Sequence, residues 1–247
     1  MNLLLDIGNS SIKWAQVDGT TLLASGSVVH RDADFGALAS HAWQAVDTPQ
    51  RVVVSNVAGA AIADSLNAWT ERHWQLKPCF VRATRQAAGL TNAYTHPETL
   101  GVDRWAAMLG ARMDHTGALC VVDCGTAITV DHVASDGMHR GGLILAGIDM
   151  MQQALQGSTA NLRVPGARQD VSLLACNTDD AIASGSLYAA AAAIDRIAGD
   201  LAATSKEPLH TVLTGGDAAR ILPLMNITAR HDPDLVLKGL AVLAGVK

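Results

Sequence analysis

The sequence predicts an α/β protein built from two similar halves. An apolar run that ends in Asp-x-Gly occurs twice, at Asp6 and at Asp123, and these positions lie about half of the 247-residue chain apart. The residues that follow each motif predict the same succession of strands and helices. We therefore expect a duplicated fold with two domains, 1–116 and 117–247.

The first half begins with three strand patterns separated by Gly-containing turns, after which helix and strand patterns alternate. Strands are expected at 2–6, 11–17, 21–28, 51–57 and 77–81, and helices at 35–45 and 60–73. A polar stretch at 84–98 predicts a long loop, and loops of this length are usually functional or disordered. A further helix is expected to follow the loop and to end near Met113.

The second half repeats this order. Strands are expected at 119–123, 128–132, 139–144 and 211–214, and helices at 148–155, 179–204 and 236–244. Asn177 or Thr178 is expected to cap the longest helix. Three meandering strands followed by alternating helices and strands are the order of a ribonuclease-H-like unit. The sequence thus predicts two ribonuclease-H-like domains, each with a mixed sheet flanked by helices.

The composition favours a folded protein without a nucleic-acid or membrane partner. Hydrophobic residues make up 49% of the chain and charged residues 17%, which argues against long disordered segments. The formal net charge is −5 and no cluster of Lys and Arg offsets it, so a nucleic-acid or anionic-membrane surface is not expected. No window approaches the ~20 apolar residues of a membrane-spanning helix and no signal peptide is apparent, which predicts a cytoplasmic protein.

The four cysteines show no Cys-x-x-Cys pairing; they are Cys79, Cys120, Cys124 and Cys176. The four-residue spacing of Cys120 and Cys124 along one strand favours neither a disulfide nor a zinc site. We expect all four to be reduced and mostly buried.

The segment from Asp6 to Lys13 has the chemistry of a phosphate-binding hairpin. A carboxylate at a strand end suits Mg²⁺, and Gly8 lets backbone N–H groups approach phosphate oxygens. Lys13 can reach a phosphate as a point charge. Short donors lie between them, at Asn9, Ser10 and Ser11. Taken alone, these residues also fit an ordinary Gly-Asn hairpin with a surface lysine.

The second copy favours the phosphate-binding interpretation. Asp123, Gly125 and Thr126 repeat the carboxylate, the glycine and the short polar residue, and Thr129 and Asp131 follow on the outgoing strand. Two such hairpins, one from each lobe, are expected to face each other and to hold one triphosphate.

Two further motifs each admit two interpretations. Gly215 and Gly216 follow a late strand, where paired glycines leave room for an adenosine, although a plain strand-to-helix turn has the same sequence. Asp103 and Arg104 stand at the expected start of a helix, where an Asp complements the helix dipole. Alternatively, Asp103 binds the hydroxyl of an acceptor and Arg104 binds a carboxylate or phosphate.

In combination, these motifs resemble the type III pantothenate kinase family. The matching segments are Asp-x-Gly-Asn-Ser-x-x-Lys, Tyr94 with Pro97 and Leu-Gly-Val-Asp-Arg, Asp-x-Gly-Thr-Ala-x-Thr-x-Asp, and Thr-Gly-Gly, in this order. Segments at 141–162 and 177–185 also fit, whereas 162–173 fits only loosely. The resemblance extends over nearly the whole chain.

The resemblance implies an actin-like ATPase and kinase fold and the ATP-dependent phosphorylation of pantothenate, the first step of coenzyme A synthesis. It also implies a monovalent cation (K⁺ or NH₄⁺) at Asp123 and Asp103 as the catalytic proton acceptor, and the hairpin chemistry above adds Mg²⁺ with ATP near Asp6. The implied ATP-binding residues, with the paired glycines added from their own motif, are Asp6, Ile7, Gly8, Asn9, Ser10, Ser11, Ile12, Lys13, Thr126, Gly215 and Gly216. The implied pantothenate-binding residues are Tyr94, Gly101, Val102, Asp103, Arg104 and Thr178.

The resemblance further implies a homodimer whose two subunits share each acceptor site. Two other interpretations remain open: another small-molecule kinase of the same superfamily, for example one acting on a sugar, and a non-catalytic nucleotide-binding regulatory protein. The acceptor segment 84–104 distinguishes the two kinases, and the presence of Asp6 and Asp103 argues against the regulatory protein.

Overall fold

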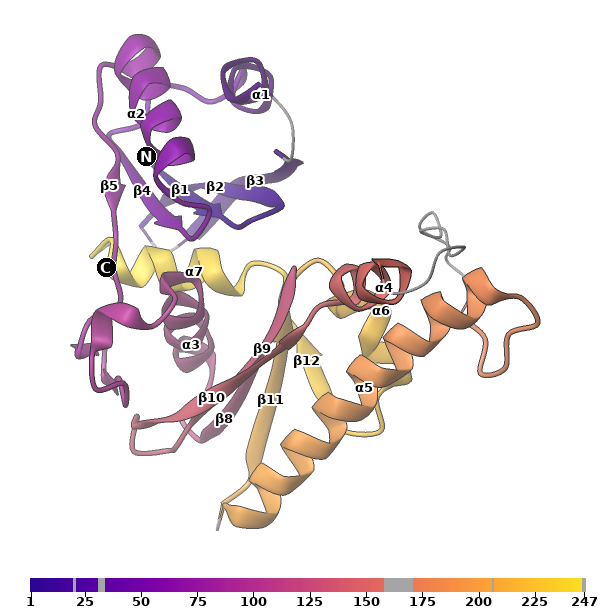
Figure 1. Ribbon diagram of the computed structural model, residues 1–247. Helices are drawn as coiled ribbons and strands as arrows, with labels where there is room; N and C mark the ends of the chain where they lie inside the picture. The colour runs from indigo at the N-terminus through magenta and orange to yellow at the C-terminus, as the bar shows by residue number, and fades with distance from the viewer. Residues whose placement is uncertain (20, 31–33, 158–170, 206, 246–247) are drawn as a thin grey trace. The chain divides into compact units, whose positions relative to one another are not determined.

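The fold is taken from a computed structural model that describes residues 1–19, 21–30, 34–157, 171–205 and 207–245 (Figure 1). The chain divides into two compact units. The first consists of Met1–Asp114, Gly137–His139 and Asp234–Lys247, and the second of His115–Asp136 and Arg140–Pro233.

A five-stranded mixed sheet forms the centre of the first unit. Its strands are β1 (Asn2–Ile7), β2 (Ser11–Asp18), β3 (Thr21–Val29), β4 (Arg51–Asn56) and β5 (Cys79–Phe80). They lie in the order β3-β2-β1-β4-β5. The first three pair antiparallel, and β4 pairs parallel with β1 and with β5.

Helices cover both faces of this sheet (Figure 1). They are α1 (Phe35–Ala42) and α2 (Ala60–Trp74) on one face, and α3 (Val102–Asp114) and α7 (Leu235–Leu243) on the other. Leu3, Leu5 and Ile7 form one core with residues of α1 and α2. Because side chains alternate along a strand, Asp6 points to the opposite face, where α7 contacts β1.

The second unit has a five-stranded sheet of the same design. Its strands are β8 (Ala118–Cys124), β9 (Ala127–Val133), β10 (His139–Ala146), β11 (Leu209–Thr214) and β12 (Ala229–His231), in the order β10-β9-β8-β11-β12. Its helices are α4 (Ile148–Gly157), α5 (Thr178–Thr204) and the short α6 (Ala218–Ile221). Cys120, Val122 and Cys124 form a core with α5, so Asp123 points to the other face of the sheet.

The predicted duplication is confirmed by the strand orders. In both sheets the first three strands of the unit lie side by side in chain order. The first of the three also pairs, on its other side, with a parallel strand that comes later in the chain. This is the ribonuclease-H-like arrangement expected from the sequence.

Several short elements were not expected. The predicted loop at 84–98 contains a small hairpin, β6 (Gln86–Ala87) and β7 (Leu90–Thr91), and a 3₁₀ turn, η1 (Pro97–Thr99). Strand β12 and the 3₁₀ turn η2 (Leu222–Leu224) are also additional. Each of these elements has only two or three residues, which is too few to produce a recognisable period.

The helix α7 lies in a different unit from the one expected. The sequence prediction placed 117–247 in one domain, whereas residues from Asp234 onward belong to the first compact unit. The contact between α7 and α3 explains this, because glycines bring the two backbones together. A Cβ atom at Gly239 would overlap the carbonyl oxygen of Ala106, and one at Gly110 would overlap that of Leu235.

Two of the four cysteines differ from the expectation of burial. Cys120 and Cys124 are buried, but Cys79 on the short strand β5 and Cys176 before α5 are exposed. All four are free thiols, as predicted. Within the described part of the chain, no helix has both the length and the apolar character needed to cross a membrane.

Candidate active site

The hairpin between β1 and β2 is held by backbone and side-chain hydrogen bonds around Gly8. Gly8 N–H donates to the carbonyl oxygen of Ser11 at 3.0 Å, and the His30 ring nitrogen Nε2 lies 2.7 Å from the carbonyl oxygen of Gly8. Asn9 is exposed at the tip, whereas Ile7 and Ile12 are fully buried. Both isoleucines therefore belong to the core beneath the hairpin.

The hairpin between β8 and β9 has the same construction. Gly125 N–H donates to the carbonyl oxygen of Ala127 at 3.1 Å, and Gly147 N–H donates to that of Thr126 at 3.2 Å. Gly147 has no room for a side chain, because a Cβ atom there would overlap the carbonyl oxygen of Thr126. The Thr126 turn is thus fixed by the backbone that follows β10.

The two hairpins differ by one residue, which the matching motifs did not reveal. Asp6 pairs with Lys13 across the first hairpin, and Asp123 pairs with Thr129 across the second. The positive charge of the first hairpin is consequently replaced by a neutral hydroxyl in the second. Asp131, the other candidate on β9, lies further along the strand and is 2% exposed.

The paired glycines lie directly after β11, beside the second aspartate. Gly215 has a φ angle of +94°, and a Cβ atom there would lie 2.5 Å from Oδ1 of Asp123 and would overlap the Cys124 carbonyl oxygen. Asp217 N–H donates to that carbonyl oxygen at 2.9 Å. A Cβ atom at Gly216 would meet nothing within 4 Å. The first glycine is therefore required by the backbone, and the second leaves space.

The thiol beside Asp123 is not a reactive group. Burial, together with the negative charges of Asp123 and Asp217, raises the pKa of Cys124 to about 12. The thiol therefore remains protonated at neutral pH and serves the core.

Asp103 occupies the first turn of α3, as predicted. Its carboxylate oxygen Oδ1 accepts a hydrogen bond from Arg104 N–H at 2.8 Å. The carboxylate folds back over Gly101, where a Cβ atom would lie 2.5 Å from Oδ1. Asp103 is half-buried, whereas Val102 beside it is buried.

Arg104 and Tyr94 form a second polar pair beside Asp103. The guanidinium Nη1 donates to the Tyr94 hydroxyl at 3.0 Å, and its central carbon lies 5.8 Å from the centre of the Tyr94 ring. Arg104 is 6% exposed. Behind the tyrosine, the fully buried ring of His139 stacks on it with 5.9 Å between ring centres and an interplanar angle of 20°.

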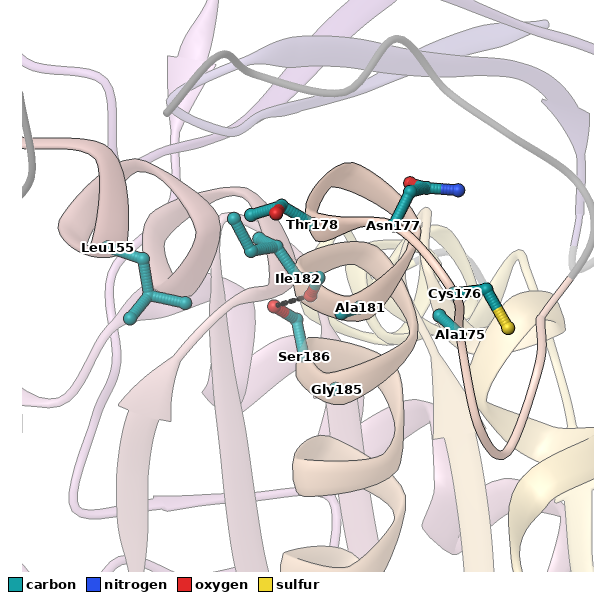
Figure 2. A pocket seen from close by; sticks show the side chains of 9 residues that line it. All are labelled: Leu155, Ala175, Cys176, Asn177, Thr178, Ala181, Ile182, Gly185 and Ser186. Atoms are coloured by element: carbon teal, nitrogen blue, oxygen red, sulfur yellow. Dashed lines mark hydrogen bonds between the residues drawn. The ribbon is translucent and has the colours of Figure 1, made fainter. Parts of the chain in front are cut away.

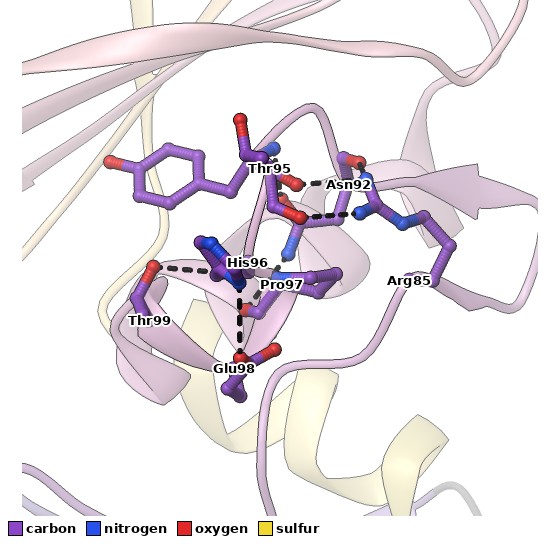
Figure 3. Close-up of polar contacts among 8 residues, drawn as sticks. Arg85, Asn92, Thr95, His96, Pro97, Glu98 and Thr99 are labelled. Carbon is purple, nitrogen blue, oxygen red and sulfur yellow. Dashed lines mark hydrogen bonds and ion pairs between the residues drawn. The ribbon is translucent and has the colours of Figure 1, made fainter.

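The segment that carries Tyr94 is held in shape by Arg85 and Asn92 (Figure 3). Arg85 donates to the carbonyl oxygens of Asn92 and Tyr94 at 2.8 Å and to that of Thr95 at 2.9 Å. The Asn92 side chain, which is 1% exposed, accepts from Tyr94 N–H and donates to the carbonyl oxygens of Thr84 and Pro97. The expected long loop is therefore an ordered structure.

In the second unit, Thr178 lines a pocket at the N-terminus of α5 (Figure 2). The pocket has a volume of about 590 Å³, and apolar side chains, among them Leu155 and Ile182, form much of its wall. Asn177 caps the helix by accepting from Asp180 N–H at 2.9 Å. A helix N-terminus favours a negatively charged group.

The structure groups the predicted residues into four clusters. The first unit holds the Asp6 hairpin and the acceptor cluster of Tyr94, Gly101, Val102, Asp103 and Arg104. The second unit holds the Asp123 hairpin with Thr126, Gly215 and Gly216, and separately Thr178 in its pocket. Of the loosely matching segment 162–173, residues 162–170 lie outside the described residues.

Sequence reasoning missed the residues that support these clusters. They are His30, Arg85, Asn92 and His139. Each of them contacts a residue that is distant in the chain or hydrogen-bonds to a backbone carbonyl oxygen. Neither kind of contact leaves a pattern in the local sequence. Asn92 alone gave a signal, because an amide inside a Gly- and Pro-containing polar stretch is typical of turns.

Known proteins match this chain closely. A family model described as type III pantothenate kinase matches residues 2–200. The type III pantothenate kinase of Nitrosococcus oceani is 46% identical over 249 residues, which cover 99% of this chain and 94% of that protein. The type III pantothenate kinase of Azoarcus sp. (strain BH72) is 41% identical over 250 residues, which cover 99% of this chain and 90% of that protein.

A solved structure shows the fold independently of close sequence similarity. Component A of the (R)-2-hydroxyglutaryl-CoA dehydratase of Acidaminococcus fermentans is similar with a TM-score of 0.56. The similarity covers 98% of this chain and 95% of that chain, at 14% sequence identity. It confirms the expected actin-like fold and, at this identity, nothing about the reaction.

Proposed function

The chain belongs to the type III pantothenate kinase family, and from this premise we propose the role of each site residue in the reaction. The protein is a kinase that transfers a phosphate to pantothenate in coenzyme A biosynthesis. A kinase of this fold uses ATP as its phosphate donor. Because phosphoryl transfer passes through a loose transition state, the protein mainly positions reactants and neutralises charge.

ATP, in this proposal, is bound by residues of both aspartate hairpins. Backbone N–H groups around Gly8 and the side chains of Asn9, Ser10, Ser11 and Lys13 bind phosphate oxygens, and Thr126 binds from the second hairpin. Gly215 and Gly216 receive the adenosine. The tight turns at Gly8 and Gly125 support this assignment, since both present backbone to a ligand at the end of a buried strand.

Two cations complete the charge balance in this proposal. Asp6 would hold Mg²⁺ together with ATP, and Asp123 would hold the monovalent cation. Among the described residues, no group of three or more His, Cys, Asp and Glu side chains is arranged to hold a metal ion. A carboxylate that shares Mg²⁺ with substrate phosphates fits this donor set, because Mg²⁺ is commonly bound by one or two carboxylates and phosphates. When bound, the cations offset the negative charge on the phosphates.

Asp103 is proposed as the catalytic residue. Its carboxylate orients the primary hydroxyl of pantothenate and accepts the proton as the hydroxyl oxygen bonds to the γ-phosphorus of ATP. The bond between the γ-phosphorus and the β,γ-bridging oxygen breaks, and ADP leaves. The bond to Arg104 N–H and the lack of a side chain at Gly101 support this role, because together they let one carboxylate oxygen lie in a fixed direction. General base catalysis by a positioned side chain typically contributes about 10²–10⁴-fold.

Tyr94, Arg104 and Thr178 are proposed to select pantothenate among possible acceptors. The planar guanidinium of Arg104 can bind the pantothenate carboxylate, and its bond to the Tyr94 hydroxyl fixes its direction. Thr178 contributes from the pocket at the start of α5, where the helix dipole also favours an anion.

We also propose the homodimer with shared acceptor sites, and exposed apolar side chains of the second unit support it. On β10, Leu143 and Ile144 are 52% and 65% exposed. Further exposed apolar residues follow on α4 and before α5; they are Met150, Leu155, Leu173 and Leu174. Apolar exposure of this extent favours burial against a second chain.

The observation that carries the proposal is the acceptor cluster, in which Asp103, Arg104 and Tyr94 are fixed by hydrogen bonds next to one helix start. The test is a coupled assay of ADP release with ATP, Mg²⁺ and a panel of acceptors that includes pantothenate and sugars. We expect turnover with pantothenate only, and only when K⁺ or NH₄⁺ is present. Equal turnover with a sugar would favour the other kinase interpretation, and turnover that is independent of the monovalent cation would contradict the role of Asp123.

A further inference from the structure

Each proposed cation-binding aspartate has a buried hydroxyl on the neighbouring parallel strand. Asp6 on β1 pairs with Ser55 on β4, and Asp123 on β8 pairs with Thr214 on β11. Side chains of paired residues point to the same face of a sheet. The duplicated fold therefore places a carboxylate and a hydroxyl next to each other twice.

Both hydroxyls lack a hydrogen-bond partner among the residues described. The exposed fraction is 0% for Ser55 and 1% for Thr214, and neither hydroxyl oxygen is bonded. Native structures rarely leave a buried polar group in this state, because it has lost its water without compensation. By contrast, Thr70 Oγ1, another buried hydroxyl of the described chain, donates to the Leu66 carbonyl oxygen at 3.0 Å.

The geometry at the end of β11 shows that the Asp123 carboxylate lies close to the strand that carries Thr214. A Cβ atom on Gly215, the residue after Thr214, would lie 2.5 Å from Oδ1 of Asp123. The glycine keeps this space free of side-chain atoms. The Asp123 carboxylate and the end of β11 at Thr214 thus border the same small region.

We propose that Ser55 and Thr214 are positioning residues for the two cations of the reaction. Ser55 serves the Mg²⁺ that accompanies ATP at Asp6, and Thr214 serves the monovalent cation at Asp123. A hydroxyl offers an oxygen to the shell of a hard cation and a proton to the carboxylate or water beside it. This inference rests on the proposed function, since it adds residues to the ATP and cation sites proposed there.

The inference is tested by thermal melting of the full chain in the variants Ser55→Ala and Thr214→Val, without any turnover. One titration uses a non-hydrolysable ATP analogue with Mg²⁺, and the other uses KCl against choline chloride at constant ionic strength. We expect Ser55→Ala to raise the analogue concentration for half-maximal stabilisation by about tenfold or more, as is typical for partners of metal ligands. Thr214→Val should raise the KCl concentration for half-maximal stabilisation by a similar factor. Thr214→Ser, which keeps a hydroxyl, should return this concentration to that of the unaltered protein.

The melting temperatures of the ligand-free variants distinguish a role in cation binding from a role in stability. Because neither hydroxyl has a partner to lose, both variants should melt at or above the temperature of the unaltered protein. The control Thr70→Val removes a bonded hydroxyl, so it should melt lower while its ligand responses stay unchanged.

Unchanged half-maximal concentrations in Ser55→Ala and Thr214→Val would overturn the inference, whatever the ligand-free melting temperatures. A failure of the unaltered protein to respond to either titration is a different result. It would refute the proposed ATP and cation sites, and the inference with them.

Discussion

At the scale of single residues, the orientation of Asp103 depends on a missing side chain at position 101. The carboxylate accepts from Arg104 N–H and occupies the space that a Cβ atom of residue 101 would need. The absence of a side chain gives the carboxylate of the proposed proton acceptor a defined direction, so the glycine belongs to the proposed site.

The variant Asp103→Asn should lower turnover by at least ~10²-fold, because an amide keeps the shape of the carboxylate but cannot accept the proton. Binding of ATP should persist, since the acceptor cluster is not part of the hairpins. Steady-state kinetics and a binding titration with an ATP analogue measure the two effects. The exposed carboxylate of α2 provides the matched control: Asp64→Asn should retain normal turnover. Near-normal turnover of Asp103→Asn would remove this residue from the role.

The cysteines give a prediction that depends on pKa. Burial raises the pKa values of Cys120 and Cys124 to about 12, so at mildly alkaline pH both remain thiols, whereas the thiolate is the form that reacts. Only the exposed Cys79 and Cys176 should react rapidly with a disulfide reagent in the folded protein. All four should react after denaturation. Mass spectrometry of the labelled protein identifies the sites, and rapid labelling of Cys120 in the native state would contradict this account.

At the scale of elements, the helix that carries Asp103 is anchored by its contact with α7. Gly110 of α3 and Gly239 of α7 let the two backbones approach more closely than any side chain would allow. The contact also has a functional consequence, because the first turn of α3 carries the acceptor cluster. A shift of the helix would therefore move Asp103 and Arg104 together.

The variant Gly239→Ala should destabilise the protein by about 1–3 kcal/mol, since its methyl group would overlap the carbonyl oxygen of Ala106 and push the helices apart. Urea denaturation measures the loss. The control is Gly199→Ala on the exposed side of α5, where a Cβ atom meets nothing within 4 Å. There the better helix propensity of alanine should add about 0.5–1 kcal/mol. An equal gain in stability from Gly239→Ala and Gly199→Ala would show that α3 and α7 do not approach each other as described.

At the scale of the whole molecule, duplication produced two sheets with the same strand order but different edges. The edge strand β3 of the first unit and the edge strand β10 of the second are equivalent positions. Both carry exposed apolar residues, with Leu23 at 55% and Ile144 at 65%. The second unit carries further exposed apolar residues on α4 and in the segment before α5.

The variant Ile144→Glu should convert a dimer into a monomer, because it places a charge in the apolar surface proposed for the second subunit. Sedimentation velocity measures the change in mass. If the acceptor site is shared, pantothenate turnover should fall together with the dimer. Leu23→Glu introduces the same charge at the equivalent edge of the other sheet and should remain dimeric. Dissociation by Leu23→Glu alone would place the interface on the first unit.

The sequence by itself determined the duplicated α/β fold and the family. Both follow from local signals, because strand alternation and turn chemistry are set by neighbouring residues, and the Asp-x-Gly motifs lie directly at strand ends. The positions of Asp6, Asp123 and Asp103 at the starts of their turns and helix needed no further information.

Only the tertiary structure decided which distant residues meet. The pairing of Asp6 with Ser55, the stacking of His139 on Tyr94 and the place of α7 beside α3 all join segments far apart in the chain. The one-residue difference between the hairpins likewise appears only in the strand register. Register and packing depend on the simultaneous fit of several elements, and such a fit leaves no period in the sequence of any one of them.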